Sequence, residues 1–200
     1  EYIDFVSANA KQMHVLIEEV LEFSKIKNQE IHKEDVDLNL IMKDIRRTLG
    51  ATLREQNATI EHDVLPVVEA QYSHVFLLLK NLIENGIKYN KSHEPHIRIA
   101  WEEQKTNYLI SVVDNGIGID PDFHQQIFEM FKRLHNHQQY KGSGLGLAIC
   151  KRIVEKFEGT IRLESQEGAG STFVFTLPRK QNAAPIIEET EPIISSLPLS

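Results

Sequence analysis

The chain has 200 residues, which is enough for one or two domains. Its 41% hydrophobic and 26% charged residues exclude wholesale disorder. A formal net charge of −7 argues against a general nucleic-acid-binding protein, because such proteins need a basic surface. The single cysteine, Cys150, excludes a disulfide scaffold and a cysteine-based zinc site. No apolar run reaches the roughly 18 residues that a membrane-spanning helix requires.

Residues 2–26 are predicted to form one long amphipathic helix. Apolar residues recur in it at alternating spacings of 3 and 4: Ile3, Val6, Ala10, Met13, Ile17 and Val20. This spacing is typical of a seam that packs against another helix. We therefore expect a helix from outside this sequence, or a second copy of the chain, to cover the seam. The alternative is that the helix packs onto the core of its own chain.

The rest of the chain is predicted to mix helices and strands. Further helices are expected at about 38–56, 73–89, 121–131 and 145–157. Asp37 and Asp120 are N-cap candidates for two of them, and a third is expected to start at Ser73. Strands are expected near 58–63, 67–70, 96–103, 107–114, 160–165 and 171–177. A polar loop is predicted over 132–144.

The first chemical motif is a polar stripe on the helix over 73–89. Its residues Asn81, Glu84, Asn85 and Lys88 fall within an arc of about 100°. The alternative is that this stripe is simply a solvent-exposed face. Such a face would favour Glu and Lys, because two asparagines one turn apart lower the helix propensity of the segment. An amide oxygen suits Mg²⁺, which takes most of its other ligands from water and phosphates. Lys88 is placed to reach a phosphate.

The second motif, Asp114-Asn115-Gly116-Ile117-Gly118, follows a predicted strand. The carboxylate therefore stands at a strand end, and the two glycines allow the backbone to turn and approach a ligand closely. A buried carboxylate can accept a hydrogen bond from the 6-amino group of adenine, whereas the carbonyl of guanine would be repelled. The alternative is an Asn-Gly hairpin turn, but a helix rather than a strand is predicted to follow.

Two glycine-rich segments come later in the chain. Residues 142–149, GSGLGLAI, form a loop that leads into a helix N-terminus, where unpaired amides and the helix dipole favour phosphate oxygens. The alternative role for these glycines is close packing. They do not fit a dinucleotide-binding motif, because the preceding stretch is not a strand. Residues 168–173 connect two predicted strands, and Thr172 is placed to add a hydroxyl to a base pocket.

In this order and spacing, these segments resemble the ATP-binding catalytic domain of sensor histidine kinases, within the superfamily shared with gyrase, Hsp90 and MutL. The segment NLIENGIKY resembles the N box, and IFEMF resembles the F box. The three glycine boxes of the family are resembled by DNGIG, GSGLGLAI and GAGSTFVFTLP. FKRLHNHQQYKG is similar to the ATP lid of phytochrome-like and PAS-linked kinases. LIEEVLEFSKI resembles the second helix of the dimerisation and phosphotransfer hairpin.

The resemblance implies an α/β fold, an α+β two-layer sandwich in which a mixed sheet of about five strands packs under three helices, with a lid over ATP. Four segments are implied: a second hairpin helix over 1–27, a linker over 28–36, the ATP-binding catalytic domain over 37–179, and a mobile tail over 180–200. The implied activity is transfer of the γ-phosphate of ATP to a histidine, for relay to an aspartate of a response regulator. The parent protein is expected to be a homodimer through the hairpin helices, and this portion is expected to be cytoplasmic.

The resemblance also implies site residues. Asn85 would hold Mg²⁺, with Asn81 close to the metal and the phosphates, and Asn81, Asn85 and Lys88 form the expected catalytic set. Asp114 would contact the adenine amine, assisted by Gly118 and Thr172. The expected ATP contacts are Asn85, Lys88, Tyr89, Asp114, Gly116, Gly118, Ile119, Phe131, Arg133, His135, Lys141, Gly142, Ser143, Gly144, Leu145, Gly146, Leu147 and Thr172.

The chain departs from the family in lacking the acceptor motif, a histidine followed by an acidic residue on the first hairpin helix. His93-Glu94-Pro95 is predicted as a loop, and His62-Asp63 lies in a strand-like run, so neither fits. We therefore expect the acceptor histidine outside this sequence. Two alternative functions remain: an ATP hydrolase of the gyrase or Hsp90 kind, and a signalling module that binds nucleotide without catalysis. The hydrolases place a glutamate where this chain has Asn81, and Glu84 is expected to point elsewhere.

Overall fold

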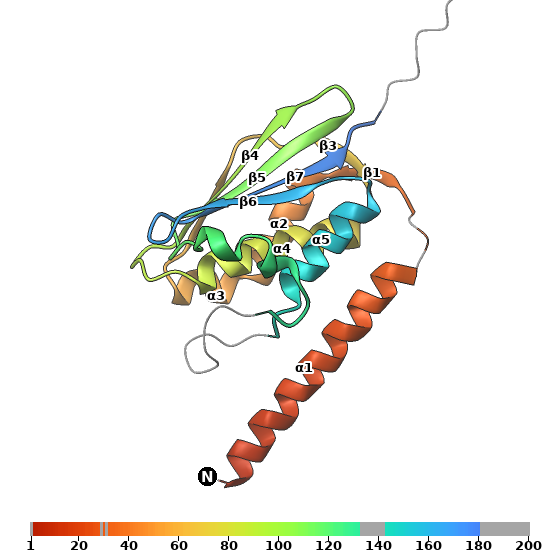
Figure 1. Cartoon of the computed structure of the whole chain (residues 1–200). Helices are drawn as coiled ribbons and strands as arrows, with labels where there is room; N and C mark the ends of the chain where they lie inside the picture. The colour runs from red at the N-terminus through yellow and green to blue at the C-terminus, as the bar shows by residue number, and fades with distance from the viewer. Residues whose placement is uncertain (1, 29, 31, 133–142, 181–200) are drawn as a thin grey trace, which may run out of the picture.

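The computed structural model describes residues 2–28, 30, 32–132 and 143–180. It shows a long helix, α1 (Tyr2–Asn28), beside an α/β domain (Figure 1). None of the helices in these described ranges is both long enough and apolar enough to cross a membrane. Most of the predicted elements are present in the domain, and the differences lie in short elements and in where helices begin, end or divide.

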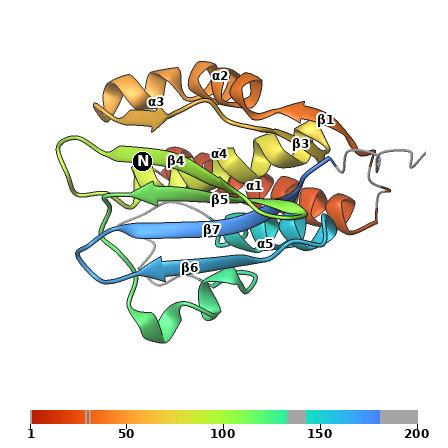
Figure 2. The same cartoon turned by 90° about the horizontal axis from the view of Figure 1, so that it is seen from above.

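The domain is built on a five-stranded sheet with the order β2-β4-β5-β7-β6 (Figure 2). Its strands are β2 (Thr59–His62), β4 (His96–Glu103), β5 (Asn107–Asp114), β6 (Ile161–Ser165) and β7 (Ser171–Pro178). β2 pairs with β4 in parallel, and the other pairs are antiparallel. The prediction of a mixed sheet of about five strands is therefore confirmed.

Helices cover one face of this sheet, which gives the predicted two-layer sandwich (Figure 1). They are α2 (Leu38–Thr48), α3 (Gly50–Glu55), α4 (Tyr72–Lys88) and α5 (Gly146–Lys156). Buried residues alternate along the strands, as in Ile97 and Ile99 of β4 and Ile110 and Val112 of β5. These side chains belong to one apolar core with the buried face of α4, so the core lies between the sheet and the helices.

The segment predicted as a linker over 28–36 contains a strand, β1 (Glu34–Asp37). It pairs in antiparallel fashion with β3 (Val67–Ala70), and the two form a separate small sheet. The linker prediction is therefore wrong for residues 34–36. The sequence EDVD has one apolar residue, Val36, which is buried, so periodicity could not reveal the strand. The strand forms because pairing with β3 satisfies its backbone hydrogen bonds, and this pairing cannot be predicted from the short sequence of β1.

Three helix predictions differ from the structure. The helix predicted over 38–56 is divided at Leu49, immediately before Gly50, into α2 and α3. The helix α4 begins at Tyr72 with no side-chain cap, so Ser73 is not its start. In place of one helix over 121–131 there are two short 3-10 helices, Pro121–Phe123 and Gln126–Phe128. Asp37 and Asp120 do cap the helices that follow them, as predicted.

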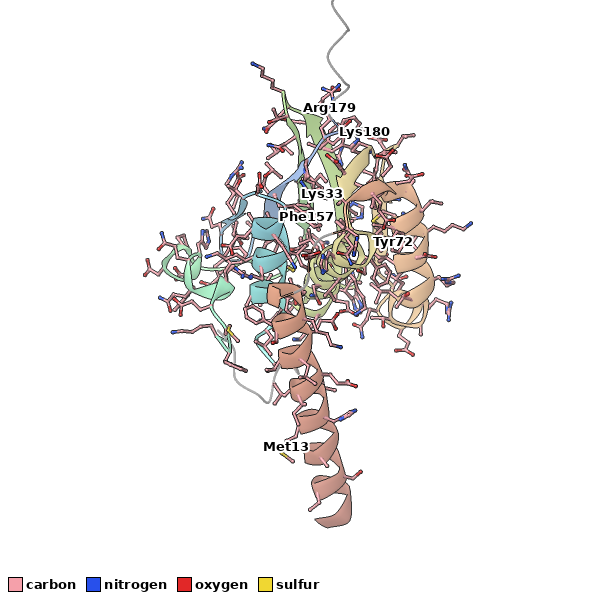
Figure 3. The ribbon with its side chains drawn as sticks, turned by 90° about the vertical axis from the view of Figure 1, so that its right-hand side faces the viewer. Met13, Lys33, Tyr72, Phe157, Arg179 and Lys180 are labelled. Atoms are coloured by element: carbon pink, nitrogen blue, oxygen red, sulfur yellow. The ribbon has the colours of Figure 1, made fainter. Side chains whose placement is uncertain are left out.

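The C-terminal end of α1 packs against the domain. Ile26 is only 2% exposed, and the Lys156 Nζ at the end of α5 donates a hydrogen bond to the Ile26 carbonyl at 2.5 Å. Phe23 packs against the same core. Val6, Met13, Ile17 and Val20 of the seam stay exposed, and Figure 3 shows Met13 on the part of α1 that extends away from the domain. The alternative interpretation is that this helix packs onto its own chain. It therefore holds for the last turns of α1 only.

Candidate functional site

A cavity of about 580 Å³ lies beside α4, the loop after β5 and the N-terminus of α5. It is bounded by three of the motifs that the sequence singles out, because α4 and α5 lie side by side under β5 and β7. Its walls include these predicted site residues: Asn81, Asn85, Lys88, Tyr89, Asp114, Gly118, Ile119, Ser143, Gly144, Gly146 and Leu147.

The polar stripe of α4 forms one wall of the cavity, as its helical spacing predicts. Asn81, Asn85 and Lys88 all line it. The Asn81 Nδ2 is buried and has no hydrogen-bond partner among the described residues. Glu84 also lines the cavity, so the expectation that it points elsewhere is wrong. Its carboxylate is bound by the Lys80 Nζ, with N–O distances of 2.8 and 2.9 Å, because the two residues are one turn apart.

Lys88 and Tyr89 stand together at the end of α4. The Lys88 Nζ donates to the Tyr89 hydroxyl at 2.9 Å and lies 4.4 Å from the centre of its ring. A cation over an aromatic ring is stabilised by the negative face of the π system. The pair therefore presents an ammonium group with a fixed position to the cavity, which is suited to an anionic ligand.

Asp114 ends strand β5 at the base of the cavity. Its Oδ1 accepts hydrogen bonds from the Gly116 amide at 2.8 Å and the Ser171 amide at 3.3 Å. Burial raises the pKa of Asp114 to about 6, and these two backbone hydrogen bonds act in the opposite direction. The carboxyl is thus ionised at neutral pH in a poorly solvated place, where a ligand amino group would be a favourable partner.

Glycines bring the polar groups of different elements together around Asp114. Gly86 lies on α4, and a Cβ there would be 2.9 Å from the Asp114 Cβ, so glycine allows α4 to pack close to β5. Gly118 has φ +69°, and a Cβ on it would lie 1.9 Å from the Gln166 carbonyl oxygen. The loop after β5 can therefore adopt this path only with a glycine at position 118.

The N-terminus of α5 faces the same cavity through Ser143, Gly144, Gly146 and Leu147. No side chain caps this helix in the described part of the chain, so its first amides are available to a ligand. Gly146 lies against Asn81, with 3.8 Å between the Asn81 Oδ1 and the position of a Cβ at Gly146. Uncapped amides and the positive end of the helix dipole favour phosphate oxygens.

Some predicted contacts are placed away from the cavity wall. Gly116, Phe131, Leu145 and Thr172 do not line it. Leu145 is buried, and the exposed Phe131 donates its amide hydrogen to the Gly144 carbonyl at 3.1 Å, with φ +61°. Side chains alternate along a strand, so Ser171 and Phe173 of β7 face the cavity and Thr172 between them does not. Arg133, His135, Lys141 and Gly142, like most of the predicted lid, lie outside the described residues.

Several residues line the cavity without having been predicted. They are Glu19, Thr52, Gln56, Glu84, Ile87, Ile117, Ile127, Lys132, Ser171 and Phe173. The apolar residues among them could have been inferred from their positions beside the motifs. Glu19 of α1 could not, because it reaches the cavity only through the packing of α1 on the domain.

The donor set fits Mg²⁺ bound together with a phosphate ligand better than a metal bound by protein alone. The described residues contain no group of three or more His, Cys, Asp or Glu that could hold a metal ion. The cavity does offer the amide side chain of Asn85 and, close by, the phosphate-favouring end of α5. Mg²⁺ commonly binds in this way, through few protein ligands and the oxygens of a polyphosphate.

Most of the domain matches a family of known proteins. Residues 70–181 match the model of the histidine kinase-, DNA gyrase B- and HSP90-like ATPases. This range covers more than half of the chain and contains every cavity residue from α4 to β7. The chain belongs to this family. The resemblance inferred from the sequence motifs is therefore confirmed.

Comparison with individual proteins agrees with this membership. Cyanobacterial phytochrome A of Nostoc sp. is 42% identical to the chain over 178 residues, which are 89% of this chain. The matched part is 23% of that relative, so the chain spans about a quarter of its length. The solved structure of full-length ShkA in complex with AMPPNP has a TM-score of 0.75 at 24% identity, covering 92% of this chain and 40% of ShkA.

A second solved structure holds histidine kinase ThkA in complex with response regulator protein TrrA. It has a TM-score of 0.69 at 22% identity, and the match covers 89% of this chain and 50% of that chain. At this identity the match shows the fold alone. The chain therefore has the fold of a histidine kinase catalytic domain.

Proposed function

We propose that this chain is the ATP-binding catalytic portion of a two-component sensor histidine kinase. It would transfer the γ-phosphate of ATP to a histidine on a segment outside this sequence. One observation carries the proposal: a single cavity gathers a buried carboxylate, an amide side chain suited to Mg²⁺ and uncapped helix amides. Family membership and the AMPPNP complex of ShkA, a protein of similar fold, support ATP as the nucleotide.

The adenine end of the site is assigned to Asp114. Its Oδ1 is occupied by two backbone amides, so the second oxygen is left to accept from the 6-amino group of adenine. Guanine has a carbonyl at that position, whose oxygen would face the carboxylate. Gly118 and Ile119 line the cavity beside Asp114, and the glycine lets the loop after β5 pass close to the Gln166 carbonyl.

The phosphate end is assigned to α4 and the start of α5. Asn85 would hold Mg²⁺, Lys88 would contact a phosphate, and the amides near Gly144 and Gly146 would bind phosphate oxygens. When bound, Mg²⁺ neutralises charge on the phosphates and orients the transferred group. A neutral imidazole nitrogen of the acceptor is already nucleophilic, so the main task of this chain is to position ATP and stabilise charge.

Phosphotransfer to a separate acceptor tests the proposal. The chain is mixed with radiolabelled ATP, Mg²⁺ and a purified hairpin of the family that carries an acceptor histidine. We expect label on the hairpin and none on this chain. Asn85→Ala should reduce labelling by about 100-fold, the size of loss seen when one transition-state charge contact is removed. The matched control is Asn107→Ala, an asparagine at the start of β5 that does not line the cavity. Unchanged transfer by Asn85→Ala would contradict the metal assignment.

Hydrolysis is the competing activity, and the structure gives it little support. A hydrolase needs a carboxylate positioned to activate water, and the residue one turn before Asn85 is Asn81. Glu84 lines the cavity, but Lys80 binds both of its carboxylate oxygens. We expect release of free phosphate to be slow compared with transfer to the hairpin. Rapid release that Glu84→Gln abolishes would instead assign hydrolysis.

The partners proposed for the whole protein follow from the same reasoning. A response regulator would take the phosphate from the acceptor histidine, in line with the complex of ThkA with TrrA. Homodimerisation would use the exposed seam of α1 together with the hairpin helix outside this sequence. A cytoplasmic location is proposed for this portion of the protein.

A further inference from the structure

Three polar residues lie in a row across the sheet next to the cavity, on strands β5, β7 and β6, which are neighbours (Figure 2). Asp114 of β5 pairs with Ser171 of β7, and Ser171 pairs in turn with Ser165 of β6. Side chains of residues directly opposite one another in a sheet share one face, so the carboxylate and the two hydroxyls follow each other. Asp114 and Ser171 line the cavity, whereas Ser165 does not.

The Ser165 hydroxyl has three hydrogen-bond partners. Its Oγ lies 2.7 Å from the Gly170 carbonyl oxygen, 2.9 Å from the Ile119 amide nitrogen and 3.1 Å from the Ser171 Oγ. A hydroxyl has one hydrogen to donate and two lone pairs that accept. The Gly170 carbonyl can only accept, and the Ile119 amide can only donate. The single hydrogen of Ser165 is therefore donated to the Gly170 carbonyl, which is also the nearer of its two possible acceptors.

This arrangement fixes the direction of the Ser171 hydroxyl. Because the hydrogen of Ser165 is used at the Gly170 carbonyl, the hydrogen between the two serines belongs to Ser171, which donates it to the Ser165 Oγ. Ser171 is only 7% exposed, so little water competes for this hydrogen, and leaving it without an acceptor would be costly. The Ser171 side chain therefore presents lone pairs, and no hydrogen, to the cavity.

Two hydrogen-bond acceptors thus stand next to each other at the base of the cavity. One is the carboxylate of Asp114, whose Oδ1 accepts from the Ser171 amide at 3.3 Å, and the other is the Ser171 Oγ. The 6-amino group of adenine has two hydrogens to donate, whereas a carbonyl at that position is itself an acceptor. A Ser171 hydroxyl that could turn would donate to such a carbonyl and so stabilise the wrong base.

We propose that Ser165 is a positioning residue that sets the base specificity of the cavity through Ser171. By accepting the Ser171 hydrogen, it keeps that side chain an acceptor and so selects a purine with a 6-amino group. Its bond to the Ile119 amide also ties the loop after β5 to strand β6, which holds a second cavity residue in place. This inference rests on the proposed binding of ATP.

The test measures, by calorimetry with excess Mg²⁺, the dissociation constants of ATP and of inosine triphosphate, which has a carbonyl in place of the 6-amino group. The specificity ratio is the dissociation constant of inosine triphosphate divided by that of ATP. In Ser165→Ala the Ser171 hydroxyl is free to turn and donate to the carbonyl. The specificity ratio should therefore fall by about ten-fold, the size expected for one hydrogen bond gained or lost.

The matched control is Ser111→Ala, the same substitution on strand β5. The Ser111 Oγ contacts the Ala100 carbonyl oxygen at 3.4 Å and does not line the cavity, so the specificity ratio should stay within about two-fold of that of the unchanged chain. Ser165→Thr keeps a hydroxyl at the position and should keep the ratio as well. If Ser165→Ala weakens both nucleotides equally, its role is structural only and the inference is wrong, while ATP binding stands.

A double-mutant cycle shows whether Ser165 acts through Ser171. Ser171→Ala should lower the specificity ratio by itself, and adding Ser165→Ala to it should change the ratio no further. Circular dichroism of each variant checks that the fold is retained. Where Ser165→Ala does not fold, Ser171→Ala still decides, because an unchanged ratio in that variant overturns the inference. If the unchanged chain binds neither nucleotide, the proposed function fails and this inference fails with it.

Discussion

The Asp114 side chain, which we propose contacts adenine, is kept ionised in a buried place at the expense of stability. Its pKa rises from 3.8 to about 6 in the folded chain because the carboxyl is buried. A raised pKa means that the folded state binds a proton more tightly than the unfolded state does. Stability from this group is therefore complete below pH 3.8 and is lost as the pH rises through about 6. At neutral pH the folded chain carries an ionised, poorly solvated carboxylate.

Asp114→Asn removes this cost. We expect the nucleotide-free variant to gain about 1–3 kcal/mol in its free energy of unfolding at pH 7.5, since each pKa unit corresponds to about 1.4 kcal/mol. The gain should shrink toward pH 4.5, where the native carboxyl is protonated. ATP affinity should fall, because the new amide donates where the carboxylate accepts. Urea denaturation at both pH values and calorimetry measure these effects.

The control for this variant is Asp122→Asn, which changes an exposed aspartate of the same domain. It should alter neither the pH dependence of stability nor ATP affinity. A gain for Asp114→Asn that is the same at pH 4.5 and pH 7.5 would mean that ionisation of the buried carboxyl is not its cause.

Two glycines with positive φ allow backbone strain to be separated from steric clash. A Cβ at Gly118 would lie 1.9 Å from the Gln166 carbonyl oxygen, whereas a Cβ at Gly168 would meet nothing within 4 Å. Both have similar φ values, +69° and +81°. We expect Gly168→Ala to cost about 1 kcal/mol for the backbone alone, and Gly118→Ala to cost about 3 kcal/mol or more. Thermal or urea unfolding measures both, and equal losses would contradict the close approach of Gly118 to Gln166.

At the scale of elements, the contact between α1 and α5 depends on a few groups at the helix ends. Lys156 stands in the last turn of α5 and donates to the Ile26 carbonyl near the end of α1, where a cation also complements the helix dipole. Because charged hydrogen bonds are stronger than neutral ones, this contact is expected to contribute strongly to the docking of α1.

Lys156→Met keeps most of the aliphatic side chain and removes its charge. We expect the last turns of α1 to open about ten-fold more often, as judged by hydrogen exchange of their backbone amides, in keeping with the loss of one charged hydrogen bond. Lys151→Met is the matched control, because Lys151 lies on the exposed side of α5 and pairs only with Glu155 at 3.9 Å among the described residues. Equal protection in the two variants would show that apolar packing alone holds α1.

The elements also show which features a sequence can predict. Strands β4 and β5 have eight residues each with alternating burial, so the period of two reveals them. The four-residue strand β1 has too few residues for a period and forms because β3 is there to pair with it. In the site, the spacing of Asn81, Asn85 and Lys88 predicts that they share one helix face. This prediction is confirmed, because all three line the same wall of the cavity.

Other parts of the site depend on tertiary structure. The sequence alone does not fix which of Ser171 and Thr172 faces the cavity, because that depends on the phase of β7 in the sheet. Glu19 depends on how a distant helix docks, which local spacing does not determine. The motifs thus predict the chemistry of the site, while sheet register and helix docking select the side chains that complete it.

At the scale of the whole molecule, α1 has two surfaces with different neighbours. The face with Ile26 contacts the domain, whereas Met13 and Ile17 are 59% and 58% exposed. Figure 3 shows Met13 on the part of the helix that extends beyond the domain. Val20 continues this seam and is 39% exposed. A contiguous apolar seam at heptad spacing is stable in water only when another helix covers it.

We therefore expect the chain to self-associate through α1 as its concentration rises, with sedimentation velocity reporting the change from monomer to dimer. Ile17→Glu should weaken this association by at least about ten-fold, because two charges would be buried in the paired seam. Val15→Glu introduces the same charge at an exposed residue outside the seam, so it should leave association unchanged. If both variants associate like the unchanged chain, contacts other than the seam hold the copies together. If Val15→Glu alone dissociates them, the pairing uses a different face of α1.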